Sequence, residues 1–142
     1  MRLQLALNVS DLDEAIDFYT RMFGVGPAKI KPGYANFAIE QPPLKLVLFE
    51  GQGETGSINH LGVETETADE VMAAEARLSA AGLETTGVDD TVCCYAEKTE
   101  TWVNGPDGTT WEWYVKHGDT ERPQNVVIGT RSGSGSGGCC AG

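Results

Sequence analysis

An internal repeat of secondary-structure signals constrains this chain more than any other feature. In each half, a strand-like segment is followed by an amphipathic segment and then by the signals of a β-hairpin. Residues 3–9 and 59–64 open the two halves. The order of elements is therefore βαβββ twice. A duplication of this size predicts an α+β fold in which two tandem modules form a curved mixed sheet around a shared cleft.

Both predicted helices carry start and end signals. We expect Ser10 to begin the first helix and Thr67 to begin the second, where Glu70 completes a capping box. Gly24 and Gly82 follow the last apolar residues of the two amphipathic segments. Because glycine readily adopts a left-handed conformation, we expect each helix to end there.

Chain length and composition favour one domain followed by a tail. A chain of 142 residues is long enough to bury a core of its own. We predict a domain over residues 1–117, with modules at about 1–54 and 57–117. Residues 118–142 include a run of glycine and serine, so we expect a flexible tail there.

The net charge excludes two classes of partner. At −11, the chain repels nucleic acid and anionic membranes, and we expect neither as a partner. The sequence shows no apolar run long enough for a membrane span and no secretory signal. We therefore predict a cytoplasmic protein.

Polar residues recur at equivalent strand positions in the two halves. Gln4 and His60 occupy the same place in the opening strands, and Lys45 and Glu112 occupy similar places in the closing strands. A pseudo-twofold fold brings these side chains to one centre if they point into the cleft. An amide oxygen, an imidazole nitrogen and a carboxylate then meet there, which suits a divalent metal. Protonated Lys45 cannot ligate, so we expect solvent or substrate at that corner.

Each of these residues also has a simpler interpretation. His60 alone would be an ordinary buried histidine. Glu112 lies between Trp111 and Trp113. It either faces inward onto a partner, or it faces solvent while the tryptophans pack inward.

Cys93 and Cys94 form an adjacent pair that points to chemistry on a metalloid. Neighbouring cysteines are poorly placed to bridge each other, whereas two thiolates together bind a thiophilic atom. Strand alternation would send them to opposite faces, so we expect a loop or bulge at this point. The alternative is a pair of small buried hydrophobic side chains. A second pair, Cys139 and Cys140, either passes the metalloid to the first or is inert, and we favour the inert reading.

Several stretches resemble the vicinal oxygen chelate superfamily. Within it, they are similar to the bacterial organoarsenical C–As lyases and equally to the related cadmium-induced proteins. The resemblance covers nearly all of residues 1–117. The stretches are LALNV at 5–9, KPGYANF at 31–37, PPLKL at 42–46, NHLGVE at 59–64 and CCYA at 93–96.

The resemblance implies a non-haem Fe(II)-dependent lyase that uses O₂ as co-substrate. Such an enzyme splits the carbon–arsenic bond of trivalent methyl or aromatic arsenicals and releases arsenite, which gives arsenical resistance. The implied iron ligands in the metal-containing cleft are Gln4, His60 and Glu112, and Cys93 and Cys94 would take the arsenic. Gln4 departs from the common pattern of two histidines and one carboxylate, so we expect weaker iron retention. Candidate accessory residues are Lys45, Tyr95, Cys139 and Cys140.

Two other functions fit parts of the pattern. A cadmium- or arsenite-binding thiolate protein without turnover would need only the cysteines. A glyoxalase-like isomerase or a dioxygenase acting on a carbon substrate would need no cysteines, and it ranks last because Gln4 and Lys45 supply neither a second histidine nor a fourth ligand. We expect a small organoarsenical as the partner. The two modules pair within one chain or are exchanged in a homodimer, and the sequence leaves both open.

Overall fold

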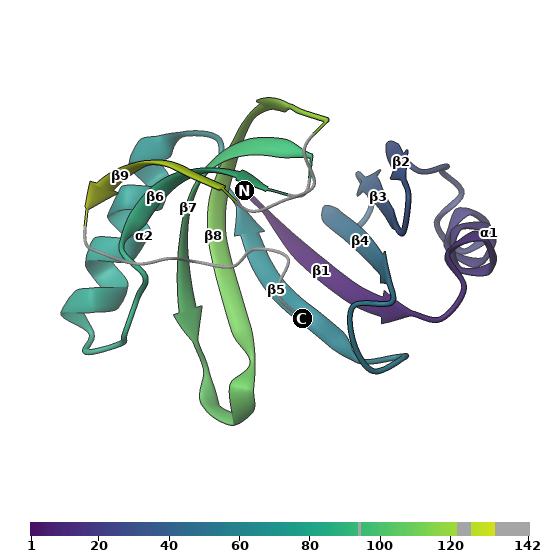
Figure 1. Ribbon diagram of the computed structural model, residues 1–142, viewed down its shortest axis with the longest axis horizontal. Coiled ribbons are helices and arrows are strands. Elements are labelled where there is room, and N and C mark those ends of the chain that lie inside the picture. The colour runs from purple at the N-terminus through teal and green to yellow at the C-terminus, as the bar shows by residue number, and fades with distance from the viewer. Residues whose placement is uncertain (94, 122–125, 133–142) are drawn as a thin grey trace. The chain divides into compact units, whose positions relative to one another are not determined.

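The computed structural model describes residues 1–93, 95–121 and 126–132. The chain forms two compact units. The first unit is Arg2–Leu61, and the second contains Met1 and the residues from Gly62 onward. The chain passes from one unit to the other within strand β5, Ile58–Glu64 (Figure 1).

The first unit is a mixed sheet with one helix. Strands β2 and β3 pair antiparallel, as do β3 and β4, while β1 pairs with β4 in parallel. The start of β5 lies on the other side of β1. Helix α1 packs against β3 and β4 (Figure 1). The elements are β1 (Arg2–Val9), α1 (Leu12–Phe23), β2 (Lys29–Lys31), β3 (Tyr34–Ile39) and β4 (Leu44–Glu50).

Strand alternation divides this sheet into an apolar face and a polar face. On β1, Leu5 and Leu7 join the core that α1 covers, together with buried residues such as Phe37 and Leu48. Residues of opposite parity on β1, of which Gln4 is one, are buried on the other face. Leu5 and Leu7 are partly buried on the apolar face, whereas the buried side chains on the other face need hydrogen-bond partners within the protein.

The start of α1 differs by one residue from the prediction. The N-cap is Asp11 and not Ser10, because the Asp11 carboxylate accepts from the Glu14 N–H at 3.0 Å and Asp11 has an extended backbone. The predicted end is confirmed. Gly24 has φ 71, a left-handed conformation, and its N–H donates to the Thr20 carbonyl.

The second unit repeats the same order of elements. The end of β5, β8, β7, β6 and β9 lie side by side, and every pair from β8 to β9 is antiparallel. Helix α2 lies across β6, β7 and β8 (Figure 1), and Val71, Val88 and Val115 form the core beneath it. The elements are α2 (Ala68–Ala80), β6 (Val88–Cys93), β7 (Ala96–Asn104), the short 3₁₀ helix η1 (Pro106–Gly108), β8 (Thr110–Asp119) and β9 (Val126–Ser132).

The predicted βαβββ repeat is confirmed, and so is the capping box of α2. Thr67 accepts from the Glu70 N–H, while the Glu70 carboxylate accepts from the Thr67 N–H. Helix α2 ends at Ala80, two residues before Gly82, which has φ 83. In the part of the chain that the structure describes, no helix is long and apolar enough to cross a membrane.

Residues 88–93 form strand β6, in which Val88 and Val92 are buried and the intervening acidic residues pair in register with β7. The predicted tail from residue 118 contains regular structure where we expected a flexible segment. Strand β8 continues to Asp119, and β9 pairs with β6.

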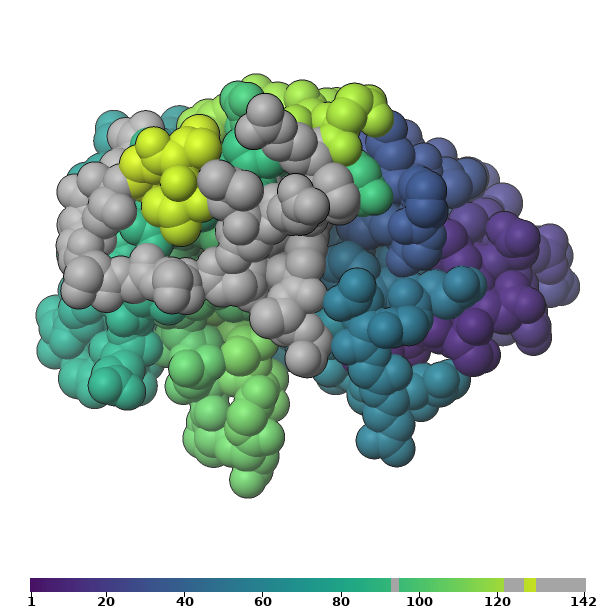
Figure 2. Space-filling view, viewed as in Figure 1, coloured from purple at the N-terminus to yellow at the C-terminus, as the bar shows by residue number. Residues whose placement is uncertain are grey.

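The apolar residues Val126, Val127 and Ile128 explain why a strand forms in the predicted tail. β-branched residues favour an extended backbone, and β6 offers a free edge for pairing. Strand β9, yellow in Figure 2, lies at the surface, where Val127 and Ile128 stay partly exposed. The remainder of the predicted tail, 133–142, lies outside the described residues.

Replacing Thr67 by alanine is expected to lower the free energy of unfolding by about 1 kcal/mol, because the Glu70 N–H loses its acceptor. The matched control is Glu66→Ala, since the Glu66 side chain is exposed and only its backbone N–H takes part in the cap. Urea titrations of both variants measure the difference. Equal unfolding midpoints would show that the cap does not stabilise α2.

Candidate functional site

The face of the first unit opposite α1 carries a group of buried polar side chains. Gln4 on β1 stands directly opposite Lys45 on β4 in the parallel ladder. Both are nearly inaccessible, at 3% and 8% exposure. His60 on β5 joins them through a side-chain contact with Gln4. The buried polar residues of this unit include Gln4, Asn8, Asn36, Lys45 and His60.

Gln4 and His60, two of the three predicted metal ligands, lie in direct contact. Their Nε2 atoms are 3.0 Å apart. On the other side of the ring, His60 Nδ1 lies 2.8 Å from Asn59 Oδ1. The Phe49 ring is 6.3 Å from the imidazole and shields it on one side. The two side chains therefore lie together, as their equivalent strand positions suggested, and their role as metal ligands stays a prediction.

Glu112, the third predicted ligand, is fully buried in the second unit. The alternative in which it faces solvent is therefore wrong. Its Oε1 lies 2.9 Å from Lys98 Nζ, and both side chains are inaccessible to water. An ion pair without water interacts far more strongly than one at the surface, and it fixes the carboxylate.

Lys98 and Glu100 are site residues that the sequence reasoning missed. Alternation along β7 places Lys98, Glu100 and Trp102 on the same face, and Trp102 stands opposite Glu112 in the ladder. Trp102 Nε1 donates to Glu100 Oε1 at 3.1 Å. The sequence feature that could have pointed to Lys98 and Glu100 is the alternation of charged residues with threonines on β7, the strand that runs beside Glu112.

Burial raises the pKa of Glu100 to about 8. The largest cause is the loss of water around the carboxyl, and the negative charge of Glu112 adds to it. The positive charge of Lys98 opposes the shift without cancelling it. Glu100 is therefore a neutral carboxylic acid at neutral pH, next to the charged pair of Lys98 and Glu112.

Tyr114 links this cluster to β5. Lys98 Nζ lies 4.6 Å from the centre of the Tyr114 ring, close enough for a cation–π contact. The Tyr114 hydroxyl donates to Glu64 Oε2 at 2.8 Å. The lysine is thus held by an aromatic face as well as by Glu112, which restricts its movement.

Cys93, the described member of the predicted arsenic-binding pair, lies at the end of β6. Cys93 is the last residue of β6 and stands opposite Ala96 in the ladder. Tyr95 follows with φ 63, a left-handed conformation, and its carbonyl accepts from the Thr120 N–H at 2.9 Å. Cys94 and the second pair, Cys139 and Cys140, lie outside the described residues.

The donor set fits an Fe(II) site in its chemistry. Gln4 and His60 are adjacent, and Glu112 offers a buried carboxylate in the other unit. Among the described residues, no three His, Cys, Asp or Glu side chains gather at metal-binding distance. A triad that includes an amide does not require such a group. Joint ligation by all three residues stays a prediction.

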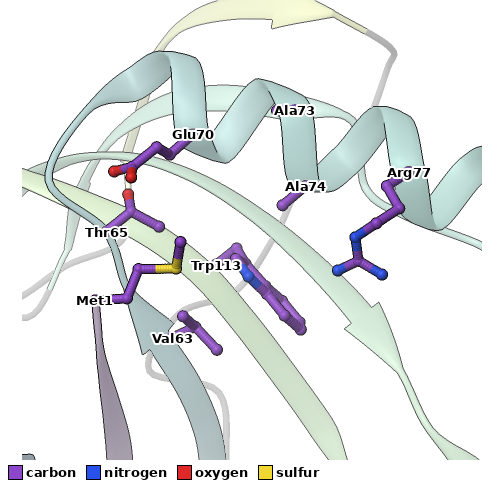
Figure 3. A pocket seen from close by; sticks show the side chains of 8 residues that line it. All are labelled: Met1, Val63, Thr65, Glu70, Ala73, Ala74, Arg77 and Trp113. Carbon is purple, nitrogen blue, oxygen red and sulfur yellow. The ribbon is translucent and has the colours of Figure 1, made fainter.

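A hollow lies in the second unit, under α2 (Figure 3). Its volume is about 460 Å³. Trp113 lines it, and because Trp113 follows Glu112 on β8, the hollow is on the opposite face of the sheet. The carboxylate of Glu70 is held by N–H groups before α2. The lining residues are Met1, Val63, Thr65, Glu70, Ala73, Ala74, Arg77 and Trp113.

The raised pKa of Glu100 predicts a pH dependence of stability in the metal-free protein. The native state keeps a proton that the unfolded chain releases above its ordinary pKa of 4.5. The stability that Glu100 contributes is therefore complete below pH 4.5 and is lost as the pH rises to about 8. Denaturant titrations of the wild type and of Glu100→Gln should diverge over this interval, and parallel curves would contradict the assignment.

Comparison with known proteins gives relatives that span the chain. It is 50% identical over 145 residues to a protein of Thermomonospora curvata named trivalent organoarsenical cleaving enzyme, covering 99% of this chain and 96% of that one. It is 55% identical over 120 residues to the cadmium-induced protein CadI of Mycobacterium bovis, covering 84% and 79% of the two chains.

A solved structure and a family profile agree with these relatives. The crystal structure of the Mn(II)-bound glyoxalase from Novosphingobium aromaticivorans matches with a TM-score of 0.61 at 18% identity, over 84% of this chain and 40% of that one. This likeness concerns the fold. Residues 3–113 match the profile of the Glyoxalase/Bleomycin resistance protein/Dioxygenase superfamily. The chain belongs to this superfamily, and the resemblance predicted from the sequence is confirmed.

Proposed function

We propose that this chain is an Fe(II)- and O₂-dependent lyase that cleaves the carbon–arsenic bond of trivalent organoarsenicals. Its substrates would be methylarsonous acid and trivalent aromatic arsenicals, and its product arsenite, so that it gives arsenical resistance. The observation that carries the proposal is 50% identity to a named organoarsenical cleaving enzyme across nearly the full length of both chains. We place the enzyme in the cytoplasm, with a small organoarsenical as its partner and neither nucleic acid nor a membrane.

Gln4, His60 and Glu112 would hold the iron. Iron held by these residues would supply the redox chemistry that activates O₂ for cleavage of the carbon–arsenic bond. The contact between Gln4 and His60 supports the proposal, because it brings an amide and an imidazole together at buried positions.

Lys98 orients Glu112 in this scheme. Its ammonium group holds Oε1 at 2.9 Å, so the carboxylate cannot turn freely about its last bond. The positive charge of the lysine lies next to the buried carboxylate and offsets part of the cost of burying it. Neutral Glu100 beside them adds no negative charge to the cluster.

Cys93 and Cys94 would hold the arsenic. Each of the two thiols replaces one hydroxyl group of a trivalent R–As(OH)₂. Each thiol proton leaves with the displaced hydroxyl group as water. The second bond forms at a high effective concentration once the first exists, so the pair binds much better than one cysteine. Fixing the organic group close to the reacting O₂ can lower the barrier by roughly 7–11 kcal/mol.

Glu112→Ala is expected to abolish the release of arsenite while leaving the binding of trivalent arsenicals intact, because it removes a metal ligand and no thiol. Protein is reconstituted with Fe(II) without oxygen, then given O₂ and methylarsonous acid, and arsenite is quantified by chromatography with elemental detection. Glu97→Ala, an exposed position on β7, is the matched control and should turn over normally. Normal turnover by Glu112→Ala would refute the proposed ligand.

The double variant Cys93→Ser/Cys94→Ser is expected to lose both arsenical binding and cleavage while it retains Fe(II). The corresponding variant of the second pair, Cys139→Ser/Cys140→Ser, should keep both. Binding of phenylarsine oxide, followed by mass spectrometry, and iron content measure the two properties separately. Loss of activity only in the second variant would show that Cys139 and Cys140, and not Cys93 and Cys94, capture the arsenic.

The 55% identity to a cadmium-induced protein favours a second candidate function. In this alternative the chain binds cadmium or arsenite through its thiolates without turnover. Wild-type protein with fresh Fe(II) and O₂ would then release no arsenite, and Glu112→Ala would bind cadmium as the wild type does. These two results together would replace the lyase by the binding protein.

A further inference from the structure

Hydrogen bonds leading to His60 form a chain with a single direction. The chain begins at the backbone carbonyl of Glu54, which can only accept, so the Ser57 hydroxyl must donate to it. The oxygen of Ser57 then accepts from Asn8 Nδ2 at 2.9 Å. This fixes which end of the Asn8 amide points toward Ser57.

The same logic continues through Asn59 to the imidazole. With its Nδ2 used by Ser57, Asn8 presents Oδ1 to Asn59 Nδ2 at 3.0 Å. Asn59 in turn presents Oδ1 to His60 Nδ1 at 2.8 Å. An amide oxygen only accepts, so the proton between these two atoms sits on Nδ1. A neutral imidazole carries one N–H, which leaves the lone pair on Nε2, facing Gln4.

We propose that Asn8 and Asn59 are positioning residues that fix the tautomer and the ring plane of His60, so that Nε2 is the nitrogen offered to the metal. Ser57, Asn8 and Asn59 are called the amide relay below. The inference rests on the proposed function in one respect, since His60 is taken as a metal ligand. Partners of this kind on the far nitrogen orient a histidine ligand and raise its basicity.

The backbone holds the amide relay in place independently of its side chains. The Asn8 N–H donates to the Ser57 carbonyl at 2.9 Å, and the Gly56 N–H donates to the Asn8 carbonyl at 2.8 Å. A Cβ at Gly53 would lie 2.8 Å from Asn8 Nδ2, so the loop can close over this amide only because residue 53 has no side chain. All of these residues belong to the first unit.

The first test is the tautomer of His60 in the metal-free wild type. Long-range ¹⁵N–¹H correlation spectra, recorded at a pH where the ring is neutral, distinguish a protonated Nδ1 from a protonated Nε2. The amide relay requires the Nδ1–H form to dominate. A dominant Nε2–H form would overturn the proposal, and the measurement needs neither metal nor activity.

The second test compares variants of the amide relay with a matched control. Asn8→Ala should lower the fraction of the Nδ1–H form and weaken the binding of Co(II), used as a spectroscopic probe, about tenfold. Asn59→Asp keeps an acceptor for Nδ1, so it should preserve the tautomer. Asn36→Ala removes a buried amide from the same face outside the amide relay and should change neither property.

The outcomes separate this inference from the proposed function. If the wild type has the Nδ1–H form but binds neither Co(II) nor Fe(II), the metal site is wrong and the amide relay stands. If metal binds and Asn8→Ala changes neither the tautomer nor the affinity, the amide relay is overturned. Ser57→Ala, which removes only the anchor, replaces Asn8→Ala if that variant does not fold, and it is judged by the same criteria.

Discussion

Burial of polar side chains on one face of each sheet is the constraint on which the rest of the structure depends. Every strand that contributes to the two cores also carries, at alternate positions, groups that cannot leave water without a partner. Many of these partners come from neighbouring strands. The register between β1 and β4 and between β7 and β8 places polar groups that are far apart in sequence side by side.

The two units bury polar groups of different chemistry. Around His60 the buried groups are mainly neutral amides, which satisfy one another through directional hydrogen bonds. Around Glu112 they are charged or acidic. The ion pair with Lys98 and the neutral state of Glu100 reduce the free-energy cost of burying these groups.

Much of the fold followed from local signals, and the site followed only in part. The repeated order, the capping box at Thr67 and the end of α1 at Gly24 depend on neighbouring residues, so the sequence predicted them. Strand β6 was not predicted, because Asp89 and Asp90 look like solvent-exposed residues, although Asp89 is buried and pairs with β7. Lys98 was missed for a related reason, since its role depends on a partner fourteen positions later on another strand.

Strand β9 has a consequence for anyone who shortens this chain. It covers the outer edge of β6, the strand that ends at Cys93. Deletion from residue 126 onward would leave the N–H and C=O groups of Val88–Cys93 open to pairing with another molecule, and exposed edges of this kind promote aggregation. An expression variant trimmed after residue 132 would keep this protection, whereas one trimmed at the end of β8 would lose it.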